Sequence, residues 1–116
     1  MNLHIKRVYA EPDKNDGRRI LVDRLWPRGL TKEKAKVDLW LKDVSPSSEL
    51  RKWFGHDPDK WHEFKRRYAG ELEHLQGPLI ALRNEAKRNK ITLLYAAKDE
   101  QHNEAVVLLE LLQNMN

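Results

Sequence analysis

The sequence predicts a single α/β domain of three layers, in which helices flank a small, mainly parallel sheet. Residues 91–97 form a nearly continuous apolar run, which is typical of a strand covered on both faces. The segment between residues 45 and 88 carries apolar side chains at helical spacing, so helices separate this strand from earlier ones. At 116 residues, the chain is long enough for one hydrophobic core and too short for two.

The first part of the chain predicts two strands. Residues 3–8 alternate between apolar and polar side chains, which indicates a half-buried or edge strand. Turn-forming residues fill positions 11–17, and residues 19–26 then form a more apolar, more central strand. We expect this second strand to end at Pro27, because proline has no N–H group to donate to a sheet.

Short elements and then two longer helices follow. Residues 31–35 can begin a short helical turn, and residues 37–41 alternate again, as a short strand or an extended connection. Residues 45–49, Ser-Pro-Ser-Ser-Glu, are typical of a helix start, with a hydroxyl cap and a proline suited to the first turn. Asp57-Pro58 repeats this device before an apolar helical stripe made of Trp61, Phe64, Tyr68, Leu72 and Leu75. Gly77-Pro78 is expected to end this helix and to begin another, which runs to about Arg88.

The last part of the chain predicts half of a βαβ unit. Residues 91–97 are expected to form the central strand, and residues 105–112 an apolar final helix. Between them, residues 98–103 are polar and span both the strand end and the helix start. The crossover connections between parallel strands should be right-handed.

Composition narrows the class of protein. The chain contains no cysteine, which excludes disulfides, thiolate metal sites and thiol nucleophiles. No segment resembles a signal peptide or approaches the roughly 20 apolar residues of a membrane span, so we expect a cytoplasmic protein without membrane partners. The net charge is +4, and residues 1–36 hold 10 Lys and Arg against 5 Asp and Glu. The excess positive charge therefore belongs to the first third of the chain, which favours anionic partners.

The first candidate site lies where the second predicted strand ends, in the sequence Asp-Arg-Leu-Trp-Pro-Arg-Gly. Ligands of open α/β sheets bind beyond the carboxyl ends of the strands. Arg24 and Arg28 can hold a phosphate or carboxylate, and Asp23 can act as a base or orient an arginine. Gly29 permits the backbone to approach a ligand closely, and Trp26 is expected to contact the ligand. The alternative is a structural corner, in which Asp23 pairs with an arginine and Trp26 fills the core.

The second candidate site is the polar interval after the predicted central strand. Asp99 is expected to cap the final helix, whose free N–H groups attract anions. His102 would then lie in the first helical turn and transfer protons near neutral pH. Lys98 adds positive charge to the same rim, and Asn103 is a further expected ligand contact. The alternative is an ordinary helix cap beside a solvated histidine.

Other polar and aromatic groups favour structural roles. Four potential metal ligands lie close together in the sequence, namely His56, Asp57, Asp59 and His62. Their spacing matches no familiar metal site, so no metal is expected. Trp53 and Trp61 fall on apolar helical stripes, which favours the core over a base-stacking surface. No Gly-rich phosphate loop is present, and no cofactor is expected.

Three segments of the chain resemble a known bacterial family. They are Arg-Ile-Leu-Val-Asp-Arg-Leu-Trp-Pro-Arg-Gly at residues 19–29, Pro-Ser-Ser-Glu-Leu-Arg at residues 46–51, and Thr-Leu-Leu-Tyr-Ala-Ala-Lys-Asp at residues 92–99, followed by His102-Asn103. On these motifs the chain resembles the YeaO-like branch of the family called domain of unknown function 488, as a single domain over residues 1–116. The resemblance implies a cytoplasmic α/β domain and names no activity.

The chain departs from the broader family at two of its motifs. In that family the second strand ends in Asp-Val-Arg, and the late strand is followed by a Cys-x-Glu segment that leads to Cys-His-Arg. Here Asp23-Arg24 resembles the first pattern, and only His102 matches the second, because both cysteines and the last arginine are replaced. The resemblance therefore implies no cysteine-based chemistry for this chain.

Two functions from different classes follow. In the first, a cleft at the strand ends binds an anionic small molecule or nucleotide, either as a hydrolase or transferase of a phosphorylated substrate or without turnover. Asp23 and His102 would share acid and base roles in the enzymatic form, which requires the two strand ends to be adjacent. In the second, the basic first third binds nucleic acid with a steep salt dependence. We favour the first, because polar groups converge on the strand ends while basic runs on the helices are neutralised.

Overall fold

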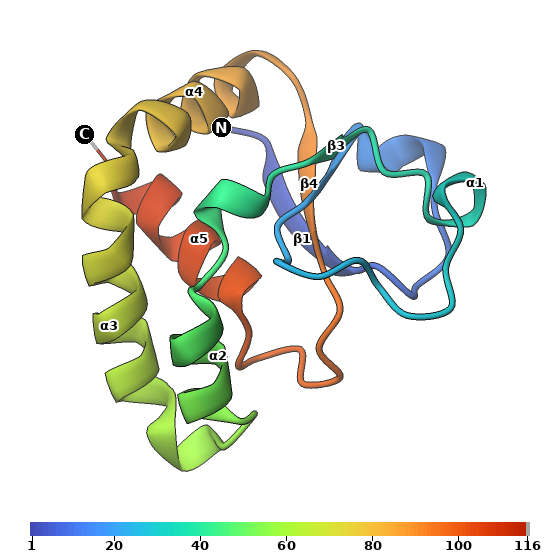
Figure 1. The fold of residues 1–116 in the computed structure, drawn as a ribbon. Helices are drawn as coiled ribbons and strands as arrows, with labels where there is room; N and C mark the ends of the chain where they lie inside the picture. The colour runs from blue at the N-terminus through green and yellow to red at the C-terminus, as the bar shows by residue number, and fades with distance from the viewer. Residues whose placement is uncertain (116) are drawn as a thin grey trace.

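A parallel sheet of four strands forms the centre of the computed structural model, which describes residues 1–115 (Figure 1). The strands are β1 (Leu3–Arg7), β2 (Arg18–Leu21), β3 (Leu39–Trp40) and β4 (Ile91–Tyr95). They lie in the order β1-β4-β2-β3, and every pairing is parallel. Because β4 lies between β1 and β2 and is buried along its whole length, the predicted central strand is confirmed. The predicted α/β class is confirmed with it.

Helices cover the two faces of the sheet unequally. The helices α2 (Ser48–Phe54), α3 (Trp61–Leu72), α4 (Gln76–Arg88) and α5 (Glu104–Asn114) gather on one side, with α5 against β1 and β4 (Figure 1). The one-turn helix α1 (Lys32–Ala35) lies on the other side with the loops around it. The layer on the second face is therefore thin. Within residues 1–115, no helix combines the length and apolar character needed to cross a membrane.

The sheet divides the core into two clusters. Leu93 packs in the larger cluster, which lies toward α2 to α5, whereas its neighbour Leu94 packs in the smaller one with Leu21 and Ala35. All four side chains are at most 1% exposed. Successive side chains of a strand point to opposite faces, so both faces of β4 require apolar residues. This explains the continuous apolar run that the sequence shows there.

The second strand is shorter than predicted. The prediction extended it to Trp26, whereas the ladder ends at Leu21, with a last bond from the Val22 N–H to the Leu94 carbonyl at 3.1 Å. Beyond this point, side chains rather than a neighbouring strand donate hydrogen bonds to the backbone carbonyls. The Ser45 hydroxyl donates to the Val22 carbonyl, and the Trp40 indole donates to the Asp23 carbonyl, both at 2.7 Å. The chain therefore leaves the sheet before the residues of the first candidate site.

The helix starts follow the predicted signals, with two shifts. Ser47, rather than Ser45, caps α2, and its hydroxyl accepts a hydrogen bond from the Leu50 N–H at 3.1 Å. Asp57 caps the short 3-10 helix η3 (Pro58–Lys60), which leads into α3 as predicted. The boundary between the two long helices lies earlier than Gly77-Pro78, where it was predicted. The 3-10 helix η4 (Glu73–Leu75) follows α3, and α4 begins at Gln76.

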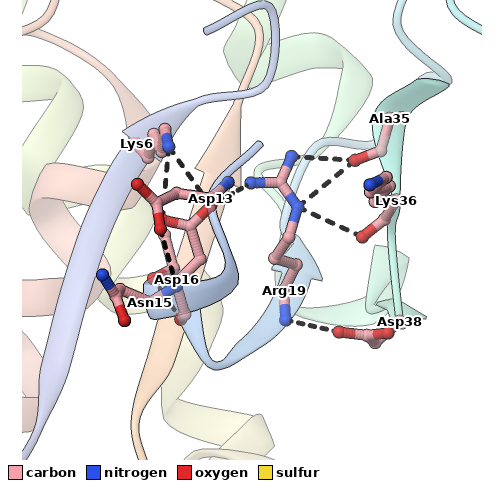
Figure 2. A network of polar contacts seen from close by, with 9 residues as sticks. Lys6, Asp13, Asn15, Asp16, Arg19, Ala35, Lys36 and Asp38 are labelled. Atoms are coloured by element: carbon pink, nitrogen blue, oxygen red, sulfur yellow. Dashed lines mark hydrogen bonds and ion pairs between the residues drawn. The ribbon is translucent and has the colours of Figure 1, made fainter. Parts of the chain in front are cut away.

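A buried polar network attaches β2 to the thin layer, as Figure 2 shows. Arg19 is 4% exposed, and its guanidinium donates to the Asp16 carboxylate at 2.6 Å. The same group donates to the carbonyls of Ala35 and Lys36 at 2.8 and 3.1 Å. All three guanidinium nitrogens therefore have partners. The network fixes the chain after α1 against the sheet.

Asp16 is the second centre of this network. It ends the 3-10 helix η1 (Lys14–Asp16) and also accepts hydrogen bonds from the Lys6 ammonium at 3.2 Å and the Asp13 N–H at 3.0 Å. Burial alone would raise the pKa of the Asp16 carboxyl, but hydrogen bonds from Asp13, Lys6 and Arg19 together hold it below its usual value. Asp16 is therefore charged, and its carboxylate is hydrogen-bonded to three other residues of the network.

Candidate functional site

A cleft of about 500 Å³ opens at the carboxyl ends of the strands. Its volume lies within the range of roughly 300–1,000 Å³ that is usual for small-molecule sites. Its walls combine the loop after β2, the helix α2 with its flanking residues, and the segment that joins β4 to α5. The lining includes Asp23, Arg28, Arg51, Phe54, His102 and Glu104.

Both candidate sites contribute to this cleft. Of the predicted site residues, five line it, namely Asp23, Trp26, Arg28, His102 and Asn103. The two strand ends are thus adjacent, as a shared site for Asp23 and His102 requires. Trp26 has an edge-to-face contact with Trp40 at a centroid distance of 5.4 Å, and its indole donates to the Leu30 carbonyl at 2.7 Å.

The other predicted residues lie outside the lining. The Arg24 guanidinium donates to the carbonyls of Pro46 and Ser45 at 2.9 and 3.2 Å, so it fixes the start of α2. Gly29 is exposed with a φ of +82°, and Lys98 is exposed as well. Asp99 reaches the cleft only through the neighbouring histidine.

The predicted role of Asp99 as the cap of the final helix is wrong. Asn103 caps α5, because its side-chain oxygen accepts from the Val106 N–H at 3.1 Å. The Asp99 carboxylate instead accepts from the Gln101 and His102 N–H groups at 2.9 and 3.0 Å, in a turn that precedes the helix. This turn places the cap four residues beyond Asp99, so His102 lies just before α5 and not in its first turn.

Asp99 and His102 form a side-chain pair. The Nδ1 atom of His102 lies 2.8 Å from the Asp99 carboxylate. Hydrogen bonds from the Gln101 backbone and then from the His102 side chain hold the pKa of Asp99 below its usual value. The imidazole and the Trp61 ring have an edge-to-face contact at a centroid distance of 5.1 Å. Because Nδ1 faces a carboxylate, Nε2 remains as the ring nitrogen that can act as an acceptor.

Glu104 is a site residue that the sequence analysis missed. It is the first residue of α5 and lines the cleft beside Asp23. Its Oε1 atom is shielded from solvent and has no hydrogen-bond partner within residues 1–115. Burial, followed by the negative charge of Asp23, raises the pKa of Glu104 to about 8, and Arg51 opposes this shift. Acidic residues are common in a first helical turn, so the sequence alone gives no signal of this environment.

Cations and apolar side chains form the rim. Arg28 and Lys52 are exposed, and Arg51 is half-buried. The Tyr9 hydroxyl donates to the Arg28 carbonyl at 2.8 Å, which joins the end of β1 to the loop after β2. Tyr9 and Leu25 are 39% and 58% exposed, so large apolar groups remain in contact with solvent beside the cations.

Two further findings narrow what this surface can bind. Within residues 1–115, no three His, Cys, Asp or Glu side chains are arranged to hold a metal ion. The carboxylate of Glu85, from outside the first third, neutralises Arg18, whereas the pairs of Lys6 and Arg19 with Asp16 draw these two cations inward from the surface. The observed geometry therefore weakens the charge argument for a nucleic-acid interface.

Comparison with known proteins identifies the family. The model of the family described as the inactive DUF488-N3 subclade matches residues 2–116. The chain belongs to this subclade. The resemblance drawn from the sequence motifs is therefore confirmed. The uncharacterised protein YeaO of Escherichia coli is 42% identical over 115 residues, which cover 99% of this chain and all of that protein.

Mycobacterial relatives are similar to this DUF488-N3 chain to the same degree. Uncharacterised proteins of Mycobacterium tuberculosis and Mycobacterium bovis are each 42% identical over 110 residues, or 95% of this chain and 92% of theirs. No solved structure shows significant similarity to the chain.

The raised pKa of Glu104 predicts a pH-dependent stability in this DUF488-N3 chain. Between the unfolded value of 4.5 and the folded value of about 8, the folded state binds one more proton than the unfolded state. The free energy of unfolding should therefore fall as the pH rises through this window. Glu104→Gln removes the titration and should stabilise the protein at pH 8 by about 2–4 kcal/mol, with little effect at pH 4.5.

The measurement is urea denaturation followed by tryptophan fluorescence at several pH values. Glu110→Gln is the matched control, because Glu110 lies on the exposed side of the same helix and pairs with Lys65 at 2.9 Å. That control should keep the parental pH slope. A Glu104→Gln protein with the parental slope would contradict the assignment.

Proposed function

We propose that the cleft binds an anionic small molecule of the nucleotide class and that the chain acts as a binding domain without turnover. One observation carries this proposal: three cations, Arg28, Arg51 and Lys52, meet aromatic side chains in one cleft at the strand ends. Guanidinium groups match the geometry of phosphate oxygens, and aromatic faces stack on planar rings.

The distribution of exposure supports an anion at the mouth of the cleft. Arg28 and Lys52 are exposed, so a phosphate can reach them while it keeps part of its hydration. Pro27 and Phe54 are buried and form apolar parts of the wall. A ligand with a charged end and a flat, less polar end fits this division. Small-molecule sites commonly combine apolar walls with a few polar groups.

Binding without turnover is favoured over hydrolysis or transfer for two reasons. The subclade to which the chain belongs is described as inactive. The chain also lacks the two cysteines and the arginine of the broader family's late motif, and of that motif only His102 matches. Asp23 and His102 lie in the cleft, where they can hold polar groups of a ligand.

A thermal-shift titration with inorganic phosphate, ribose 5-phosphate and nucleoside monophosphates tests the proposal. A ligand at one hundred times its Kd should add about 2.7 kcal/mol to the free energy of unfolding. For a domain of this size, that corresponds to a rise in Tm of roughly 10 °C. Arg28→Ala should abolish most of the rise, because it removes the exposed guanidinium at the mouth.

Arg88→Ala is the matched control. It removes one exposed arginine at the end of α4, which does not line the cleft, so the shift in Tm should persist. Chromatography of the bound nucleotide after a long incubation should show it unchanged. The proposal fails if no phosphate compound raises Tm, or if both variants respond alike.

Nucleic-acid binding by the basic first third stays a prediction. Fluorescence anisotropy with a short duplex and a single strand at low salt measures it directly. Binding that weakens steeply between 50 and 200 mM salt, as counterion release requires, would support it (on the order of a thousandfold for six phosphate contacts).

A further inference from the structure

The floor of the cleft contains a hydrogen-bond acceptor that the protein leaves free. Glu104 Oε1 is shielded from solvent and unpartnered within residues 1–115, and the Asp23 carboxyl lies beside it. Arg51 is close enough to act on Glu104 electrostatically, but no hydrogen bond joins the two side chains in the part of the chain described. Buried acceptors without partners are rare because each costs free energy. A ligand donor can supply the missing partner.

The two carboxyl groups come from separate elements. Asp23 follows β2, and its carbonyl is held by the Trp40 indole, whereas Glu104 begins α5 directly after the buried cap Asn103. Both positions are therefore fixed by the fold. The pair lies in the cleft whose rim carries the cations Arg28 and Lys52. The cleft thus has an acidic floor and a basic rim.

We infer that the Asp23–Glu104 pair binds the edge of a base that presents adjacent N–H and NH2 donors, as guanine does, while the rim holds the phosphate. This inference rests on the proposed function and specifies the ligand further. Near neutral pH the raised pKa keeps a proton on Glu104, beside the Asp23 carboxyl. Each of the two groups still has an oxygen that can accept one of the two donors. Phe54 and Phe64, whose rings stack on each other at a centroid distance of 4.3 Å, also line the cleft and give the base an apolar surface.

Three free compounds isolate the contribution of the base edge. Guanosine monophosphate carries both donors, inosine monophosphate lacks the exocyclic amine, and ribose 5-phosphate lacks the base. Calorimetric titration of the intact protein should show guanosine monophosphate binding at least tenfold more tightly than inosine monophosphate, since loss of one well-placed pair costs about that factor. Ribose 5-phosphate should bind most weakly.

The variants assign the preference to the carboxyl pair. Glu104→Leu removes both carboxyl oxygens, so the preference for guanosine over inosine monophosphate should fall to less than threefold. Affinity for ribose 5-phosphate should not change. Asp23→Asn should act in the same direction. Glu110→Leu, on the outer side of the same helix, should keep the parental preference.

The outcomes separate this inference from the proposed function. If guanosine and inosine monophosphates bind equally while Arg28→Ala weakens both, the base-edge inference fails and the anion site stands. If no phosphate compound binds, both fail. A single-stranded oligonucleotide with one internal guanine serves as a fourth probe. If it binds more tightly than guanosine monophosphate, the ligand is nucleic acid, and the inference of a free nucleotide is overturned.

Discussion

Arg19→Met should lower the free energy of unfolding by about 3–5 kcal/mol, which is the usual cost of breaking a buried ion pair by removing one partner. The substitution leaves the Asp16 carboxylate with Lys6 as its remaining cation. It also removes the donors to the Ala35 and Lys36 carbonyls, which fix the thin layer to the sheet (Figure 2). Urea denaturation followed by tryptophan fluorescence measures the change.

Arg18→Met is the matched control for this experiment. Arg18 is the neighbouring residue of β2, but it is exposed and makes a single ion pair with Glu85. Exposed pairs contribute about 0–1 kcal/mol, so this variant should remain close to the parent. Equal losses in the two variants would show that the buried network does not stabilise the fold.

Gly17→Ala should destabilise the fold by more than about 3 kcal/mol, because two costs add. Gly17 has a φ of +67° and a ψ of −142°, a conformation that residues with a Cβ atom avoid. A Cβ atom at this position would also lie 2.3 Å from the backbone oxygen of Lys90. The same oxygen accepts the Arg18 N–H at 3.0 Å, so it cannot move without loss of a strand contact.

Gly29→Ala separates the two costs. Gly29 has a φ of +82°, but a Cβ atom there would meet nothing within 4 Å. Only the backbone cost of about 1–2 kcal/mol should remain. Differential scanning calorimetry should therefore give a much lower Tm for Gly17→Ala than for Gly29→Ala. Similar Tm values would show that the close approach of Lys90 is not a constraint.

The sequence predicts those elements whose cause is local. The apolar run of β4 indicates two covered faces. The segment at residues 45–49 and Asp57 mark helix starts, because hydroxyl and carboxylate groups bind the N–H groups next to them, although the cap of α2 is Ser47 and not Ser45. The end of β2 was predicted too late because its cause is distant. The Ser45 hydroxyl and the Trp40 indole, far along the chain, take the carbonyls that a longer strand would use.

The sequence predicts the position of the candidate site at the strand ends, but it does not predict all of the residues that line it. The sequence gives no reason to treat Arg24 and Arg28 differently. In the structure, Arg24 donates its hydrogen bonds to carbonyls before α2, whereas Arg28 lines the cleft. Glu104, in contrast, lines the cleft although the sequence does not single it out. A glutamate at a helix start has an ordinary explanation, and only its burial and the nearby Asp23, from the loop after β2, make its environment unusual.

The loop after β2 is held in place before any ligand arrives. The Tyr9 hydroxyl and the indole N–H groups of Trp26 and Trp40 each donate to a backbone carbonyl of residues 23–30, at distances of 2.7–2.8 Å. Ordering a flexible loop on association costs conformational entropy, which weakens affinity. Because this cost is already met in the folded chain, a ligand should associate in one kinetic step, without a slow phase for loop closure.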